Sequence, residues 1–316
     1  MPSEHLVDPE LAGLFEQIPS LSFQDVPLET IRALAASAAP PRPPPPPEVE
    51  VYEAWAPAQN GAPDVRLVVT APKSTGATRP ALLHVHGGGY VLGDADMTAE
   101  TDQAYARELG AVVVSVDYRL APETPHPGPV EDCYAGLAWL HRNAERLGVD
   151  ANRVAVTGES AGGGLAAALA LLALSRGVLP IAFQHLVFPM LDDRTAVDTT
   201  SSPFFGQFVW TREASRFGWA ALLGAEPGGS DVSPFASPAR AADLSGLPPT
   251  FIACGALDLF LEENLDYARR LLRAGVPTEL HIYPGAPHGF MMIPTADVSL
   301  RFARDSTAAL SRALRG

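Results

Sequence analysis

Basic residues are scarce in this chain. It has 22 Lys and Arg against 36 Asp and Glu, which gives a formal net charge of −14 at pH 7. A surface with that balance repels polyanions, whereas a nucleic-acid partner needs a basic patch. The composition therefore argues against a DNA- or RNA-binding protein.

Cysteine is scarce too, with 2 residues in 316. Cys133 and Cys254 each lie inside an apolar run, which favours two buried free thiols over a disulfide. Neither has the paired spacing that a zinc site needs. We expect no disulfide and no metal.

No long apolar segment occurs. The most hydrophobic one, LAAALALLAL at residues 165 to 174, is well short of the ~20 residues that a membrane-spanning helix requires, so it predicts a buried helix. The first residues, MPSEHLVDPELAGLF, carry acids early and lack the basic and apolar regions of a signal peptide. We expect no membrane span and a cytoplasmic location.

The chain does have enough apolar material, 47% of its residues, for a large core. Near the start, apolar residues recur at helical spacing: Leu11, Leu14, Phe15, Ile18, Leu28, Ile31 and Leu34. The proline run that follows ends at Pro47 and predicts an extended spacer. A ligand for an aromatic groove is the functional alternative for that run.

Short β-branched runs then alternate with helical patterns. The expected strands are 82–85, 111–116, 154–158, 185–188, 250–254 and 279–283, and the expected helices are 97–109, 130–147, 161–176, 263–274 and 296–314. Strands that are apolar on both faces, with helices between them, predict a mostly parallel sheet covered on each side. The segments VEVYEAWA and VRLVVTAP alternate more and predict an antiparallel hairpin at the edge.

The alternation breaks from Leu191 to about Glu226. Acidic residues, Ser-Ser-Pro and a dense set of aromatics replace it: Phe204, Phe205, Phe208, Trp210, Phe217 and Trp219. This segment is predicted to be an insertion. The expected division is 1–47 for N-terminal helices and linker, 48–190 for the first part of the core, 191–226 for the insertion, and 227–316 for the rest of the core.

The strand at 154–158 runs directly into GESAG and a helix. Glycines in G-x-S-x-G allow the tight turn between strand and helix that lifts a serine above a sheet, so Ser160 is the candidate nucleophile. Such a serine needs a base and an acid that orients the base. Asp258 and His288 follow later strands in the order acid then histidine, and Glu262 and Asp266 are alternatives for the acid.

Three consecutive glycines follow another strand, in HVHGGGYVLGD at residues 84 to 94. Attack on an acyl carbon creates an oxyanion, which backbone N–H groups can stabilise where no side chain intervenes. We assign this oxyanion hole to Gly88, Gly89 and Ala161. His86 is interpreted as a hydrogen-bonded anchor of the loop. A phosphate cradle is the competing interpretation, but no Lys-Ser/Thr follows the glycines.

These motifs occur together with others along the chain, namely DYRLAPE at 117–123, VED at 130–132, FPMLDDR at 188–194 and PHGF at 287–290. The set resembles the hormone-sensitive-lipase-like carboxylesterases, the bacterial family IV branch of the α/β-hydrolase superfamily. The resemblance implies an α/β-hydrolase fold whose N-terminal helices and 191–226 insertion form a helical cap. It also implies hydrolysis of small-molecule esters with short or medium acyl chains, and a possible homodimer.

The sequence departs from the family at three places. Glu159 precedes the nucleophile where aspartate is commoner, the loop after Asp258 lacks the usual proline, and His126 stands where an aromatic is more usual. No catalytic group is lost, so we expect a serine carboxylesterase with no cofactor. A lactonase or a small-molecule deacetylase with the same triad, and a non-catalytic receptor on the same fold, are the alternatives.

Overall fold

The computed structural model describes residues 3–14, 22–38, 41–57, 61–73 and 78–315. Its strands are β1 (Val49–Ala56), β2 (Val65–Pro72), β3 (Arg79–Val85), β4 (Val112–Val116), β5 (Val149–Glu159), β6 (Phe183–Val187), β7 (Thr250–Gly255) and β8 (Thr278–Tyr283). They form one sheet in the order β1-β2-β4-β3-β5-β6-β7-β8. The pairs β1/β2 and β2/β4 are antiparallel and the other pairs are parallel. The predicted parallel sheet and edge hairpin are confirmed.

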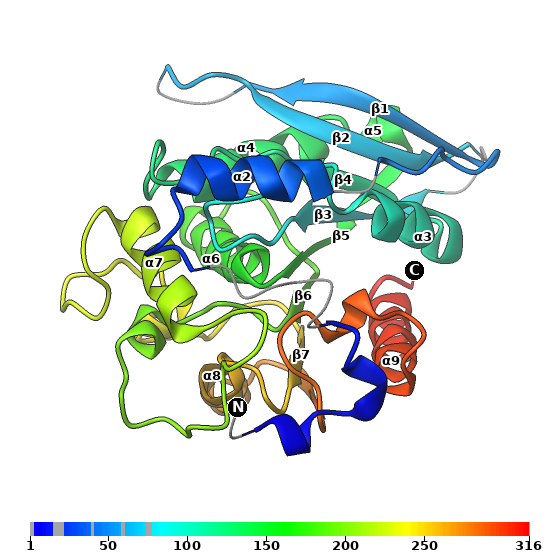
Figure 1. The fold of residues 1–316 in the computed structure, drawn as a ribbon. Coiled ribbons are helices and arrows are strands. Elements are labelled where there is room, and N and C mark those ends of the chain that lie inside the picture. The colour runs from blue at the N-terminus through cyan, green and yellow to red at the C-terminus, as the bar shows by residue number, and fades with distance from the viewer. Residues whose placement is uncertain (1–2, 15–21, 39–40, 58–60, 74–77, 316) are drawn as a thin grey trace.

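Helices cover both faces of the sheet, as predicted. On one side lie α3 (Ala99–Leu109) and α9 (Asp297–Ala313), and on the other lie α4 (Gly128–Arg142), α6 (Ala161–Arg176) and α8 (Leu261–Arg273), as Figure 1 shows. The helix α6 is buried on every side from Ala161 to Ala173, because small and apolar residues surround its axis. The apolar run at 165–174 is therefore the buried helix that the sequence predicts.

The predicted helix 130–147 is wrong in one respect, because it is two helices. The first, α4, ends at Arg142, and a short α5 (Ala144–Leu147) follows. Asn143 lies between them and donates from both its backbone N–H and its side-chain amide to the carbonyl of Trp139, at 3.0 and 2.8 Å. The asparagine side chain thus competes with backbone N–H groups for a helical carbonyl, which accounts for the break between the two helices.

The N-terminal segment contains two 3₁₀ turns, η1 (Glu4–Leu6) and η2 (Pro9–Leu11), and the helix α2 (Leu28–Ala38). Two of the apolar residues with helical spacing, Phe15 and Ile18, lie outside the described residues. The described part of the proline run has no helix or strand, and Gln103 on α3 donates to the carbonyl of Pro43 at 3.0 Å.

The segment 191–226, predicted above to be an insertion, contains a helix whose bounds the sequence analysis did not give. A 3₁₀ turn, η3 (Asp193–Ala196), is followed by a loop and by α7 (Arg212–Leu223). The Thr211 hydroxyl caps α7 by accepting from the N–H of Ala214 at 3.2 Å. Bulky aromatics and Gly218 are poor helix formers, so local propensity alone gives a weak signal there.

The N-terminal segment contacts the insertion although the two are far apart in the chain. Phe23 stacks on Phe217 at a centroid distance of 4.7 Å and meets Trp210 edge-on at 6.0 Å. The Ser3 hydroxyl donates to the side chain of Gln207 at 2.8 Å. The two segments therefore pack as one layer on the core.

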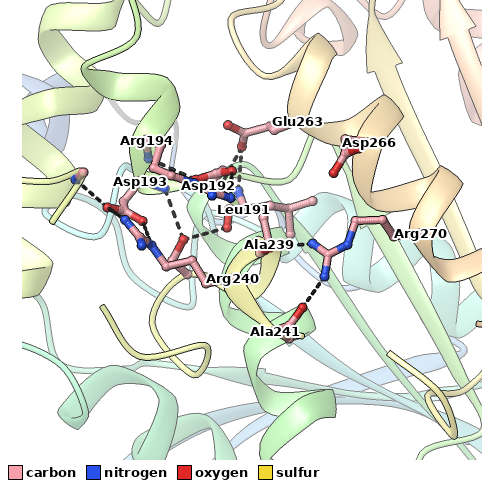
Figure 2. Close-up of polar contacts among 12 residues, drawn as sticks. Leu191, Asp192, Asp193, Arg194, Ala239, Arg240, Ala241, Glu263, Asp266 and Arg270 are labelled. Carbon is pink, nitrogen blue, oxygen red and sulfur yellow. Dashed lines mark hydrogen bonds and ion pairs between the residues drawn. The ribbon is translucent and has the colours of Figure 1, made fainter. Parts of the chain in front are cut away.

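Buried acidic side chains fix the start of the insertion to the core (Figure 2). The Asp193 carboxylate is fully buried and accepts from Arg240 at 2.6 and 2.9 Å and from the N–H of Gly228 at 2.6 Å. Burial alone would raise the pKa of Asp193, but these donors hold it below its usual value. On α8, buried Glu263 accepts from the N–H of Leu191 at 2.6 Å.

The two cysteines are free and buried, as predicted. Across the part of the chain that the structure describes, none of the helices has the length and hydropathy needed to cross a bilayer.

The Asp193–Arg240 pair generates a prediction for stability. We expect Arg240→Met to lower the free energy of unfolding by about 3–5 kcal/mol in urea titration, because it leaves a buried carboxylate without its counter-charge. Arg216→Met is the control, since its pair with Glu226 is exposed on the same insertion and should contribute less than about 1 kcal/mol. Equal losses in the two variants would contradict the prediction.

Candidate active site

A strained turn carries Ser160 between β5 and α6. Its φ and ψ are 57° and −123°, a conformation that non-glycine residues rarely adopt and that usually marks a functional constraint. The turn is held by the Ser160 N–H, which donates to Val187 at 2.9 Å, and by the Ser160 carbonyl, which accepts from Gly164 and Met190 at 3.0 Å each. The hydroxyl therefore has a fixed starting position above the sheet.

His288 lies between Ser160 and Asp258. Its Nε2 is 3.0 Å from the Ser160 Oγ, and its Nδ1 is 2.8 Å from the Asp258 Oδ2. Asp258 follows β7 and His288 follows β8, so both side chains come from loops at the carboxyl edge of the parallel sheet. A serine, a histidine and a carboxylate in this order can activate the serine for nucleophilic attack.

The competing acids lie elsewhere. Glu262 and Asp266 are exposed on α8, and Asp266 pairs with Arg269 at 2.5 Å. Asp258 is fully buried, and its second oxygen accepts from the N–H of Phe260 at 2.9 Å, just before α8 begins. One carboxylate thus contacts the histidine and also holds the backbone turn that precedes α8.

The glycine loop after β3 has the backbone conformation that only glycine adopts readily. Gly88 has φ 115° and Gly89 has φ 61°. Among the described residues, no hydrogen bond uses the N–H of Gly88, Gly89 or Ala161. Three backbone donors from two loops therefore remain available for a bound group.

His86 anchors this loop, in agreement with the sequence interpretation. It is buried, its Nδ1 lies 2.8 Å from the carbonyl of Gly87, and its ring stacks on Tyr118 at 4.2 Å. Burial lowers the pKa of His86, which favours the neutral ring.

Aromatic rings surround the histidine. The centroids of Phe188, Phe260 and Trp210 lie 4.6, 5.3 and 6.5 Å from that of His288. Trp210 belongs to the insertion and packs directly on the glycine loop, because a Cβ added to Gly89 would lie 2.5 Å from its Cζ2. The Trp210 indole nitrogen is buried and has no protein partner in the described structure. The surroundings of His288 are thus apolar.

The sequence analysis overlooked a buried trio of charged side chains next to this site. His84 on β3 lies between Asp102 and Glu159, with contacts of 2.6 and 2.9 Å. Two features of the sequence could have indicated this trio: His84 is a titratable residue in an otherwise apolar strand, and Asp102 is an acid on the buried face of a helix. Glu263, which holds the start of the insertion, was missed as well.

His126 contacts the insertion through its backbone, whose N–H donates to the carbonyl of Leu222 on α7 at 2.7 Å. Nothing in the structure explains why its side chain is histidine. In the described part of the chain, no cluster of three or more His, Cys, Asp or Glu side chains could hold a metal ion.

Comparison with known proteins agrees with this architecture. Residues 82–292 match the α/β hydrolase fold family. A carboxylesterase, NlhH of Mycobacterium tuberculosis, is 36% identical over 264 residues, which cover 81% of this chain and 80% of that protein. A bacterial heroin esterase of known structure superposes with a TM-score of 0.92 and 42% identity over 99% of both chains. The esterase LipW from Mycobacterium marinum gives a TM-score of 0.79 and 35% identity over 99% of this chain and 97% of that one.

The chain therefore belongs to the α/β-hydrolase family, in the hormone-sensitive-lipase-like branch. Within that branch it is a carboxylic ester hydrolase, as its relatives are.

The contact between Gly89 and Trp210 generates a second prediction. We expect Gly89→Ala to lower kcat/KM for ester hydrolysis by about 100-fold or more, because the new methyl group displaces either the loop or the ring. The control is Gly110→Ala, which has nearly the same φ of 63° but no atom within 4 Å of the added Cβ. It should lose about 1 kcal/mol of stability and keep its activity. Equal kcat/KM in the two variants would refute the prediction.

Proposed function

We propose that this protein is a serine carboxylesterase in which Ser160 is the nucleophile, His288 the general base and Asp258 the acid that orients the base. The observation that carries the proposal is the pair of contacts made by His288, 3.0 Å to the Ser160 Oγ and 2.8 Å to the Asp258 Oδ2. This combination of groups can perform ester hydrolysis through an acyl-enzyme.

In the first half of the reaction, neutral His288 takes the proton of Ser160 as the hydroxyl attacks the ester carbonyl. The bond between the acyl carbon and the alcohol oxygen then breaks, and His288 returns the proton to the leaving alcohol. In the second half, His288 activates water, which attacks the acyl-enzyme and releases the acid. Asp258 holds the imidazole in the required tautomer and stabilises its cation.

The N–H groups of Gly88, Gly89 and Ala161 stabilise the oxyanion in this proposal. Two observations support the assignment: no protein acceptor among the described residues uses these donors, and Ala161 is the first residue of α6, where backbone N–H groups point out of the helix. Negative charge is also favoured at a helix N-terminus.

The cap in this proposal consists of residues 1–47 and the insertion 191–226. Contacts between Phe23 and Phe217 and between Ser3 and Gln207 support a single unit. Since the aromatic wall near His288 is apolar and Ser160 is only 6% exposed, we infer that the pocket suits short or medium acyl chains rather than long ones.

A second candidate is hydrolysis of a drug-like ester, the deacetylase alternative. It is favoured by the 42% identity over 99% of both chains with the bacterial heroin esterase. Hydrolysis of heroin, followed by chromatography and compared with simple esters at equal concentration, tests it. A kcat/KM below that of every simple ester would reject this candidate.

Replacement of the nucleophile tests the main proposal. We expect Ser160→Ala to lower kcat on aryl esters by at least about 10⁴-fold without a loss of thermal stability. The matched control is Ser306→Ala, because Ser306 is also buried and its hydroxyl lies 2.8 Å from a histidine, His185, outside the site. Esterase activity that survives in Ser160→Ala would reject the mechanism.

Trp210 tests the proposed pocket. On esters of one alcohol with acyl chains from acetyl to palmitoyl, we expect Trp210→Ala to raise kcat/KM for longer chains relative to acetyl by about tenfold or more. Trp210→Phe keeps an aromatic ring and should keep most of the wild-type preference. An unchanged preference in Trp210→Ala would mean that Trp210 does not bound the acyl side, and a series of acetates of different alcohols would then test the other side.

A further inference from the structure

A buried histidine lies close to the proposed nucleophile without taking part in the proposed chemistry. The Nδ1 of His84 is 2.6 Å from the Asp102 Oδ1, and its Nε2 is 2.9 and 3.1 Å from the two carboxylate oxygens of Glu159. The side chains of His84 and Asp102 are fully buried, and that of Glu159 is 14% exposed. Three strongly polar groups are thus withdrawn from water at one place.

The geometry points to a protonated ring. Each ring nitrogen faces a carboxylate oxygen, and a nitrogen can donate only if it carries a proton, whereas neutral imidazole has one N–H. Burial opposes the charge, but the carboxylates of Glu159 and Asp102 outweigh it and raise the pKa of His84 to about 10.

Asp102 is held in place independently of His84. Its second oxygen accepts from the hydroxyls of Thr98 at 2.9 Å and Ser115 at 2.5 Å. Because Asp102 already has these two donors, one end of the trio is fixed to α3 and β4. Glu159 at the other end has His84 as its side-chain partner in the described structure.

The other titratable groups around His84 are uncharged at neutral pH. Tyr105 on α3 has a pKa raised by burial. Burial lowers the pKa of His185 on β6, which the charge on His84 lowers further, to about 3. His86, two residues after His84, also has a pKa lowered by burial. The charged groups that face His84 are therefore the two carboxylates.

The trio joins the two loops that the proposed mechanism uses. Glu159 directly precedes Ser160 and is the last residue of β5, while His84 lies on β3 two residues before His86 and the glycines. The strands are neighbours, with His84 paired to Thr157 and Val85 to Gly158. The Glu159 carbonyl also packs on the glycine loop, since a Cβ on Gly87 would lie 3.1 Å from it.

We propose that His84 is a positioning residue whose positive charge holds Glu159, and through it Ser160, in register with the glycine loop. The inference rests on the proposed function of Ser160. Loss of the charge would leave a carboxylate buried without a counter-ion one residue from the nucleophile. The turn would then shift to solvate it, and the attacking oxygen would move relative to the oxyanion donors.

A double substitution separates this role from general stabilisation. We expect His84→Gln to lower kcat by about 10- to 100-fold while KM changes less than about threefold, because binding does not depend on the turn. Adding Glu159→Gln removes the isolated carboxylate and should restore kcat to within about threefold of wild type. Both variants keep Asp102 and remove its histidine partner. The difference in kcat between them is therefore due to Glu159.

His185→Gln is the matched control. His185 is equally buried on a strand of the same sheet, but its nitrogens lie 2.9 and 2.8 Å from the hydroxyls of Thr157 and Ser306 and face no carboxylate. We expect kcat of His185→Gln to stay within about threefold of wild type. Wild-type kcat in His84→Gln, or a double variant no faster than His84→Gln, would overturn the proposal.

The pH dependence of kcat gives a second readout. With a soluble alkyl ester and titration of the released acid, wild-type kcat should fall as pH rises through about 10, where His84 loses its proton. This fall in kcat at high pH should persist in His185→Gln and be absent in the double variant. The same proton should stabilise the fold fully below pH 6.5, with the contribution lost as pH rises to about 10.

Direct observation of the ring keeps the test independent of activity. In the NMR spectrum of ¹⁵N-histidine-labelled protein, the His84 signals are assigned by their absence in His84→Gln or by their change of shift in Glu159→Gln. The His84 ring should be an imidazolium at pH 8. A neutral ring at that pH would overturn the proposal even if a variant failed to fold. An active Ser160→Ala would reject the proposed function and, with it, this inference. A neutral His84 together with an inactive Ser160→Ala would reject this inference alone.

Discussion

The parallel register of β3, β5, β7 and β8 is the constraint on which the site depends. Parallel strands bring their carboxyl ends to one edge of a sheet, so residues about 30 to 130 positions apart in the chain meet there. The pairings of Val85 with Gly158 and of Gly255 with Tyr283 fix where each strand ends. The glycine loop, the serine turn, the acid and the histidine all begin within a few residues of those ends.

The fold was largely predictable because its signals are local and periodic. Buried strands appear as short β-branched runs, and helices appear as apolar residues at helical spacing. The boundary at Asn143 was missed because it depends on one side chain that competes for a backbone carbonyl. The bounds of α7 were missed because this helix is stabilised by packing of aromatics against the N-terminal segment, a contact that no local pattern encodes.

The candidate site was predictable for the residues that sit in motifs with a known structural context, such as Ser160 in GESAG. The residues that support it were not. Glu159 was noticed as an unusual neighbour of the serine, but its partner is 75 positions away on another strand. A contact of that kind depends on strand order, which the sequence implies only in outline.

The pairing of Ser3 with Gln207 bears on how the protein is produced for study. An affinity tag fused ahead of residue 3 would emerge beside the segment that carries Trp210 and Phe208. A tag fused at the other end would follow α9, on the face of the sheet opposite to α6 and α8 (Figure 1). Expression with a C-terminal tag, or removal of an N-terminal one, therefore keeps foreign residues away from the aromatic wall when substrate preference is compared among variants.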